Sequence, residues 1–501
     1  MNEDDREHNP GIAAPPPKVD RAALAGLAGS ARKALDDLRP GGKVPPRRTL
    51  AGEAMCEISV RLKVVTPILG GGPKLRDVDR VDIIRVPTVR GHLRFWWRAL
   101  YGHQYTTSQE LYAAESALWG RPADNTGSGG RSGVVEVDKE GARSSVDVRI
   151  DVDRSGLPKP DETPVEIGSV KGYALWPARE PHADRRPPGT DFQLTIIGPA
   201  AQEVALKNVV RAWILFGGYG SRTRRGLGSL TVAGDNASWL PPATTKDASG
   251  FRTVLTELFS TDVFSGQPAC PTVETPILAR ASLFMGDAVR ATTDNPDAGT
   301  WAIALGWLRD FRQGMNTGAR RRPAKGDPEP RRPSISHWPE ADVWRSIEGG
   351  TYSHSSRYAG QRAYPRAGFG LPIQTRFQSK RRGGGVLQEP DNFTLYWHDG
   401  ANVHDRFGSA LIVKALPLRG NMFAPCALWL TRAYPAKANV VVRETTVAQT
   451  GASFDANYIA HPDAPEFVKS AGVDGLREAF TNWLYYDAPA QLQQTIRAIS
   501  A

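Results

Sequence analysis

Apolar and polar residues alternate over residues 56–65, the first regular pattern along the chain. An alternation with a period of two predicts a half-buried β-strand, and Thr66-Pro67 ends it, because proline has no N–H group for a sheet ladder. The apolar positions are Ile58, Val60, Leu62 and Val64, and the polar ones are Ser59, Arg61 and Lys63. Shorter patterns predict strands over residues 83–87, 191–197 and 227–232.

Two segments between these strands have the spacing of amphipathic helices. Residues 89–101 carry an apolar stripe with Leu93, Trp96 and Leu100, and residues 203–216 carry another. The resulting order of strand, helix, strands, helix and strand predicts a split βαβ sheet.

The second half of the chain echoes the first. Residues 275–279 repeat the Thr-Pro-Ile-Leu pattern of residues 66–70, and residues 306–312 resemble residues 91–97. Two echoes in the same order, at similar separations, indicate a duplication. Residues 465–486 and 491–499 have helical patterns, so we expect two helices in the C-terminal tail.

Length and composition allow sizeable cores, since the chain has 501 residues and is 40% apolar. Residues 1–52 are rich in Pro, Ala, Gly and charge, and we expect most of this segment to be disordered. We place one domain in residues 53–240 and a second domain, with a helical tail, in residues 241–501.

The formal net charge of +10 indicates an anionic partner, and nucleic acid is favoured over a membrane. No apolar run approaches the roughly 18 residues of a spanning helix, and the acidic N-terminus has no signal-type apolar core. We therefore expect a cytoplasmic protein. Cys56, Cys270 and Cys426 lie far apart, and no nucleotide-binding or zinc pattern is present, so no cofactor or metal is predicted.

The strongest candidate for binding chemistry is the segment 222–228, Arg-Thr-Arg-Arg-Gly-Leu-Gly, which follows the glycine cluster 217–220. Glycines let main-chain N–H groups approach a polyanion, and arginine presents a planar fork of donors that matches phosphate oxygens. We name residues 217–228 the Gly/Arg loop. Its expected RNA contacts are Gly218, Gly220, Gly226, Arg222, Arg224 and Arg225. An ordinary Gly/Arg-rich surface turn is the alternative.

A row of arginines follows one face of the predicted helix 89–101. Arg90, Arg94 and Arg98 recur every four residues, and almost no acids lie within the helix to pair with them. RNA binding by this row is the prediction, and a solvated basic face is the alternative.

A second basic segment contains Arg320, Arg321 and Arg322 and is followed by Trp338. Basic residues interleaved with aromatic ones suit single-stranded RNA, because phosphates attract cations and bases stack on rings. The alternative is a mobile surface loop.

Catalysis is the competing class of function. RNA cleavage through the 2′-OH needs a general base and a general acid, usually histidine, and His92 beside the arginine row is the candidate. A lone histidine is more often structural. Asp79, with Asp77 and Asp82, has the oxygen ligands that Mg²⁺ prefers, and the alternative is a set of salt-bridge partners or turn caps.

Taken together, these residues resemble the RAMP superfamily of CRISPR-associated proteins and, within it, the first-numbered subunit of the type III-B (Cmr) effector complex. The resemblance rests on residues 66–72, 84–98 and 217–228, and on residues 337–340 and 368–373 in the second half. It implies an α+β protein with two ferredoxin-like, RRM-related domains in tandem, with insertions and a C-terminal helical segment.

For function, the resemblance implies a non-catalytic subunit that contacts guide RNA or captures target RNA near the 3′ end of the guide, beside other RAMP subunits. Related RAMP ribonucleases process guide precursors, so a processing endoribonuclease is the alternative.

Overall fold

The computed structural model describes residues 54–72, 78–122, 141–166, 169–179, 184–244, 247–269, 274–313, 340–353, 362, 364–377, 386, 388–404, 406–434, 438–442, 451–453, 476–487 and 496–500. Contacts divide the chain into two units, Met1–Ala54 and Met55–Ala501, and every helix and strand below belongs to the second unit. The prediction for residues 1–52 lies outside the described residues.

The first sheet contains three of the predicted strands and one strand, β3, that the sequence patterns did not predict. β1 (Met55–Val64), β3 (Asp147–Val152), β5 (Asp191–Pro199) and β6 (Leu230–Val232) lie in the order β3-β5-β1-β6, and every neighbouring pair is antiparallel. α2 (Val86–Tyr101) and α3 (Ser108–Trp119) lie between β1 and β3 in the chain, and α5 (Glu203–Phe216) lies between β5 and β6. The predicted helix over residues 203–216 and the mixed helix and sheet content are confirmed.

A second sheet repeats this connectivity. β7 (Ile277–Met285), β12 (Leu411–Leu418), β13 (Met422–Thr431) and β16 (Arg497–Ser500) lie in the order β12-β13-β7-β16, with β8 (Val289–Arg290) paired to β13. α7 (Thr300–Gln313) follows the first of these strands, and α12 (Leu476–Asn482) precedes the last. In both sheets the strands are therefore ordered second, third, first, fourth.

Insertions in the second half form a third sheet. Its strands are β9 (Ile373–Thr375), β10 (Phe393–His398), β11 (Val403–His404), β14 (Asn439–Val442) and β15 (Ala452–Ser453). α9 (Glu340–Glu348) packs Val343 and Trp344 against Phe393 and Leu395 of this sheet. The remaining short elements are β2 (Ile68–Leu69), η1 (Gly102–Gln104), α4 (Val170–Ala174), η2 (Trp176–Arg179), β4 (Arg185–Arg186), η3 (Ala200–Gln202), η4 (Thr223–Arg225), α6 (Ala248–Phe259), η5 (Pro365–Phe369) and the π-helical η7 (Trp483–Asp487).

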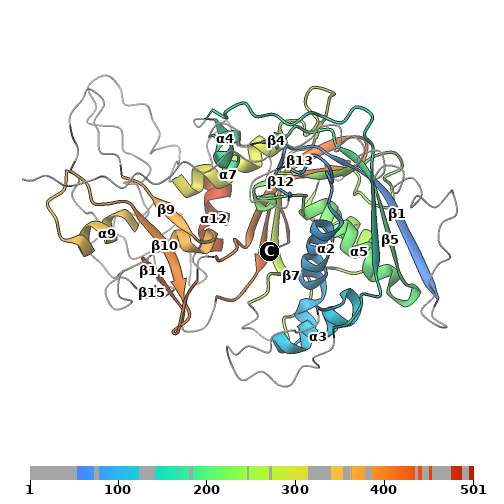
Figure 1. The fold of residues 1–501 in the computed structure, drawn as a ribbon, viewed down its shortest axis with the longest axis horizontal. Helices are drawn as coiled ribbons and strands as arrows, with labels where there is room; N and C mark the ends of the chain where they lie inside the picture. The colour runs from blue at the N-terminus through green and yellow to red at the C-terminus, as the bar shows by residue number, and fades with distance from the viewer. Residues whose placement is uncertain are drawn as a thin grey trace, which may run out of the picture. The chain divides into compact units, whose positions relative to one another are not determined.

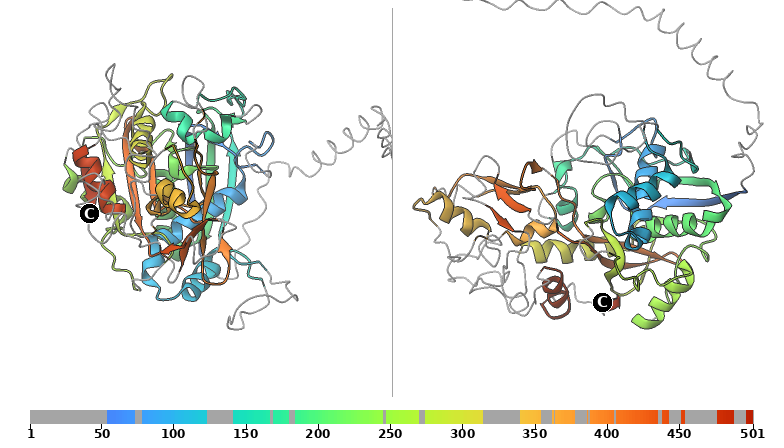
Figure 2. Two further views of the ribbon diagram at one scale, coloured as in Figure 1. Left: turned by 90° about the vertical axis from the view of Figure 1, so that its left-hand side faces the viewer. Right: turned by 90° about the horizontal axis from the view of Figure 1, so that it is seen from below.

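Helices α2 and α5 lie between the two main sheets (Figure 1). Their apolar residues share one core with β1 and β5 on one side and with β7, β12 and β13 on the other. β12 is buried on both faces, since Ile412 and Leu416 join this core while Leu411 and Val413 pack with α7 and α12 in a second core. Figure 2 gives the same arrangement from two further directions. The first-half helices thus depend on the second sheet for part of their burial.

Two predicted elements are wrong. Residues 83–85 form bends and coil rather than a strand, and α2 begins at Val86 with Pro87 in its first turn, where the missing N–H group costs no helical bond. The tail helix expected over residues 491–499 is contradicted by β16, because the edge of β7 supplies hydrogen-bond partners to this segment. The helix expected over residues 465–486 is present in its described part, as α12 and η7.

The two sequence echoes have different structural meanings. Residues 91–97 and 306–312 both lie in the first helix after the first strand of their sheet, so this echo is equivalent in the structure. The Thr-Pro echo lies after β1 in one half but just before β7 in the other. No described helix is both long and apolar enough to cross a membrane.

Candidate nucleic-acid interface

The Gly/Arg loop begins where α5 ends and has a backbone that only a few residue types adopt. Gly220, Arg222 and Gly226 have φ values of 92°, 57° and 76°, in the left-handed region. A side chain at Gly226 would also collide with the Trp301 ring, whose Cδ1 would lie 2.5 Å from the added Cβ. A Cβ at Gly218 would lie 2.8 Å from the Leu227 carbonyl oxygen. These glycines are therefore required for the close packing of the loop.

Hydrogen bonds hold the loop from both halves of the chain. Thr66 Oγ1 donates to the Gly226 carbonyl at 2.7 Å and accepts from the Ser229 N–H at 2.8 Å. From α7 in the second half, Trp301 Nε1 donates to the Arg225 carbonyl at 2.7 Å. The loop is thus a rigid part of the fold rather than a loose surface turn.

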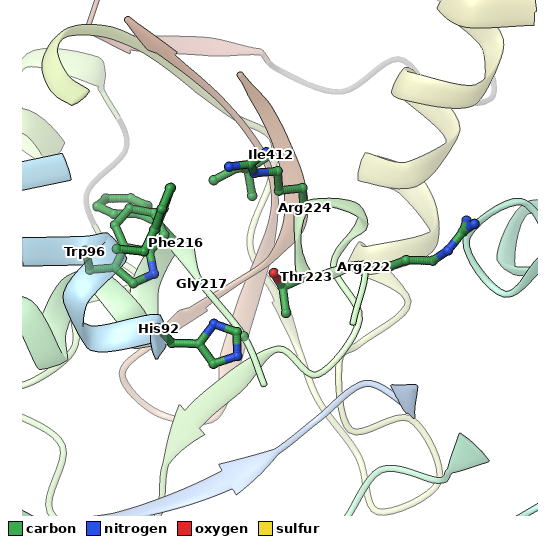
Figure 3. A pocket seen from close by; sticks show the side chains of 10 residues that line it. His92, Trp96, Phe216, Gly217, Arg222, Thr223, Arg224 and Ile412 are labelled. Atoms are coloured by element: carbon green, nitrogen blue, oxygen red, sulfur yellow. The ribbon is translucent and has the colours of Figure 1, made fainter. Parts of the chain in front are cut away.

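The three arginines of the loop point to different surroundings. Arg222 and Arg224 extend to opposite sides (Figure 3); Arg222 Nη1 donates to the Ala174 carbonyl at 3.3 Å, and the Arg224 guanidinium lies 5.4 Å from the Phe95 ring centroid. Within the described part of the chain, neither Arg224 nor Arg225 forms an ion pair with a carboxylate. Their charge is therefore available to an anion.

Arg225 joins an arginine cluster around Tyr173. Its guanidinium lies 5.0 Å from the centroid of the Tyr173 ring. Burial alone would raise the pKa of the Tyr173 hydroxyl, but the positive charges of Arg312, Arg225 and Arg366 lower it. Glu340 is the carboxylate paired with Arg366, at 3.1 Å. Among the described residues, the three guanidiniums near Tyr173 therefore outnumber the Glu340 carboxylate, and this side of the loop is electropositive.

The arginine row of α2 has partners that the sequence argument did not identify. Arg94 Nε donates to Glu115 Oε1 at 2.6 Å, and Arg98 pairs with the same oxygen. Glu115 is buried and comes from α3, the next helix, rather than from α2 itself. Arg90 donates to the Trp119 carbonyl at 2.8 Å at the end of α3. The structure thus gives these arginines a structural task, and their contact with RNA stays a prediction.

His92 packs among aromatic rings. Its ring is stacked on Trp213, with centroids 6.1 Å apart, and lies edge-on to Tyr219 at 6.2 Å. Burial lowers the pKa of His92 to about 4, so the imidazole is neutral at physiological pH.

Asp79 stabilises the turn that precedes α2. Its Oδ1 accepts the Val81 and Asp82 N–H groups at 2.9 and 2.8 Å, and its Oδ2 lies 3.6 Å from Arg85 Nε. Asp77 lies outside the described residues. Elsewhere in the described chain, no group of three or more His, Cys, Asp or Glu residues is placed to hold a metal ion.

The second basic segment cannot be placed, because Arg320, Arg321, Arg322 and Trp338 lie outside the described residues. Sequence reasoning also missed three residues that support the Gly/Arg loop, namely Thr66, Trp301 and Lys414. Lys414 Nζ donates to the Ile214 and Gly217 carbonyls, both at 2.8 Å, where α5 runs into the loop. A lone lysine within the apolar run 411–418 was the signal for this contact.

The chain is similar to several solved structures and, in its first half, to a protein family. No curated protein sequence matches the chain. The apo form of Cmr1 from Pyrococcus furiosus is 13% identical, with 80% of this chain and 93% of that one covered and a TM-score of 0.42. A chain of the type III-B Cmr-beta complex bound to cognate target RNA is 10% identical, with 76% and 97% covered and a TM-score of 0.38.

Cmr6 from Pyrococcus furiosus is 12% identical, with 36% of this chain and 98% of that one covered and a TM-score of 0.20. These TM-scores are too low for residues of those structures to be matched to residues here. The model of the RAMP superfamily matches residues 61–231, a range that contains α2, α5 and the whole Gly/Arg loop. Over residues 61–231, the chain is therefore similar to the RAMP superfamily.

Proposed function

We propose that this chain is a non-catalytic RNA-binding subunit of a type III-B CRISPR ribonucleoprotein effector complex. It contacts guide RNA, target RNA or both near the 3′ end of the guide, together with other RAMP subunits. The observation that carries the proposal is the rigid Gly/Arg loop inside the RAMP match, with Arg224 and Arg225 directed at ring faces and not at carboxylates. Guanidiniums held in this way suit phosphate oxygens.

The arrangement of the sheets supports two ferredoxin-like domains in tandem. Each sheet runs strand, helix, strand, strand, helix, strand, and each has the spatial order second, third, first, fourth. We assign residues 53–240 to the first domain and residues 241–501, with their inserted third sheet, to the second.

The packing of the candidate catalytic residues supports a binding role. His92 is stacked within an aromatic cluster, and Asp79 accepts turn N–H groups beside Arg85. Purified chain incubated with radiolabelled RNA should leave the RNA intact. Cleavage that disappears in His92→Ala, or that disappears in Asp79→Ala and on chelation of divalent ions, would establish the processing endoribonuclease instead.

The loop is tested by a triple variant, Arg222→Ala/Arg224→Ala/Arg225→Ala. We expect it to weaken binding to unrelated RNAs about equally, because phosphates carry no sequence. The log–log dependence of affinity on salt should become shallower by about 0.7 for each phosphate that the protein no longer neutralises. The measurement is fluorescence anisotropy of a labelled single-stranded RNA over a salt series.

A matched control removes three exposed arginines on other segments, Arg143, Arg154 and Arg290, and lowers the net charge by the same amount. If the loop variant and this control have the same affinity and salt slope, the loop has no special role. Membership of the complex is tested separately by tagged purification from the native cell, in which short guide RNAs and other RAMP subunits should copurify.

A further inference from the structure

A pocket of about 340 Å³ opens beside the Gly/Arg loop (Figure 3). It is lined by residues of α2, the end of α5, the loop and β12, among them Phe95, Trp96, Phe216, Arg224 and Ile412. Small-molecule sites commonly have volumes of about 300–1,000 Å³. This pocket is at the small end of that range, so it suits one planar ring system better than an extended chain.

The walls combine aromatic rings with a cation. Trp96 and Phe216 have ring centroids 6.0 Å apart, and the Arg224 guanidinium lies 5.4 Å from the Phe95 ring. Aromatic rings and guanidinium planes are the surfaces on which unstacked bases of single-stranded RNA pack.

The pocket also contains a polar side-chain atom that has no hydrogen-bond partner among the described residues. His92 is one of the lining residues, and its Nε2 is buried with no hydrogen-bond partner among the described residues. Buried polar atoms nearly always have a partner, and a neutral imidazole has one donor and one acceptor. His92 thus brings a hydrogen-bonding group to an otherwise aromatic wall.

Positive charge accumulates at one side of the pocket. Arg224 lies against Gly408, where any side chain would collide with its guanidinium. Arg432 donates to the Gly408 carbonyl at 2.7 Å. Burial lowers the pKa of Arg432 to about 10, with a further contribution from the charge of Arg224 that Glu274 offsets in part. Two neighbouring guanidiniums favour an anionic group beside the ring system.

We propose that this pocket receives a single unstacked nucleobase of the bound RNA, with the ring against Phe95 and its neighbours and the adjoining phosphate near Arg224. The inference rests on the proposed function, because it adds a base contact beside the Gly/Arg loop, which is proposed to bind the RNA backbone. It predicts that the protein distinguishes RNA from a bare ribose-phosphate chain.

The test compares two ligands on the full-length protein: an abasic ribose-phosphate chain, and the same chain with one base at its centre. The single base should tighten binding roughly 5- to 150-fold, the range for one base stacked on an aromatic residue. Phe95→Leu should abolish this gain, so that the variant binds the two chains equally. Comparing the two chains within one variant separates the base contact from any change in phosphate binding through Arg224, whose guanidinium lies against the Phe95 ring.

A second variant, Thr223→Trp, fills the pocket from the loop without removing a core side chain, and it should also abolish the gain. Tyr112→Leu is the control, because Tyr112 is an aromatic residue of α3 that is 44% exposed and does not line the pocket. Thermal unfolding of each variant serves as the check that it is folded.

The inference is overturned if the single base adds no affinity in the wild type, or if the gain survives both Phe95→Leu and Thr223→Trp. Salt-dependent binding of the abasic chain in that case leaves the proposed function standing, whereas failure to bind either polymer contradicts the proposed function itself. A free nucleoside monophosphate that binds as tightly as the one-base chain would identify a mononucleotide site and overturn the assignment to RNA.

Discussion

Lys414 shows how one residue outside the RAMP match supports the candidate site. It is fully buried on β12, and its ammonium group donates to two carbonyls at the C-terminal end of α5. The last carbonyls of a helix have no hydrogen-bond partner within the helix, so a cation there supplies the missing donor. Its positive charge also interacts favourably with the negative end of the helix dipole. Burial nevertheless lowers the pKa of Lys414 to about 7, because the charged form is costly away from water.

Lys414 should make stability depend on pH. The pKa is about 7 in the folded chain and near its ordinary value of 10.5 when unfolded, so between these values the unfolded state binds more protons. The contribution of Lys414 to the free energy of unfolding should therefore rise with pH above about 7, by at most about 1.4 kcal/mol per pH unit. Lys414→Met should remove this rise.

Denaturant unfolding at pH 6, 7.5 and 9 measures the effect as the difference between wild type and variant. Lys159→Met, which replaces an exposed lysine, serves as the control. A difference between wild type and Lys414→Met that is the same at all three pH values contradicts the prediction.

At the scale of elements, α2 is held to α3 by charge as well as by packing. The buried carboxylate of Glu115 accepts from two arginines one turn apart on α2, and Arg90 reaches the carbonyl end of α3. Breaking a buried pair leaves the remaining charges without their partner. The arginine row therefore fixes the helix pair that carries Phe95 and Trp96 to the pocket.

We expect Glu115→Gln to lower the free energy of unfolding by about 1–3 kcal/mol, since it removes a buried negative charge from two guanidiniums while keeping the shape of the side chain. Thermal and denaturant unfolding measure this decrease.

Arg94→Ala distinguishes a structural role of the arginine row from a role in RNA binding. A salt slope reduced by about 0.7 in this variant, with unchanged stability, would assign Arg94 to RNA.

At the scale of the molecule, the two halves share a core. Leu283 of β7, Ile412 and Leu416 of β12 and Leu428 of β13 pack in the same cluster as α2 and α5. Removing the second half would expose an apolar face of the first-half helices, and large exposed apolar patches promote association or aggregation. The two proposed domains are thus structurally interdependent.

A fragment of residues 53–240 should aggregate or remain partly unfolded when expressed alone. Coexpression with residues 241–501 should restore a soluble complex of the two fragments. Size-exclusion chromatography and amide hydrogen exchange measure the outcome. A monomeric fragment with protected amides in α2 and α5 would show that the first half folds independently.

The sequence by itself determined the elements whose pattern is long and local. β1 and α5 follow their alternating and helical spacing closely. Local patterns fix which face of a strand or helix is apolar, so these features are readable from the chain alone.

Only the tertiary structure decided how distant residues meet. Glu115 joins the arginine row from another helix, Lys414 and Trp301 reach the loop from the second half, and residues 497–500 become a strand on the edge of β7. The pocket between α2, the loop and β12 depends on the same long-range packing. A single polar residue such as Lys414, or a short segment such as residues 497–500, carries no information about its partner. The partner depends on how the whole chain packs to bury its apolar residues.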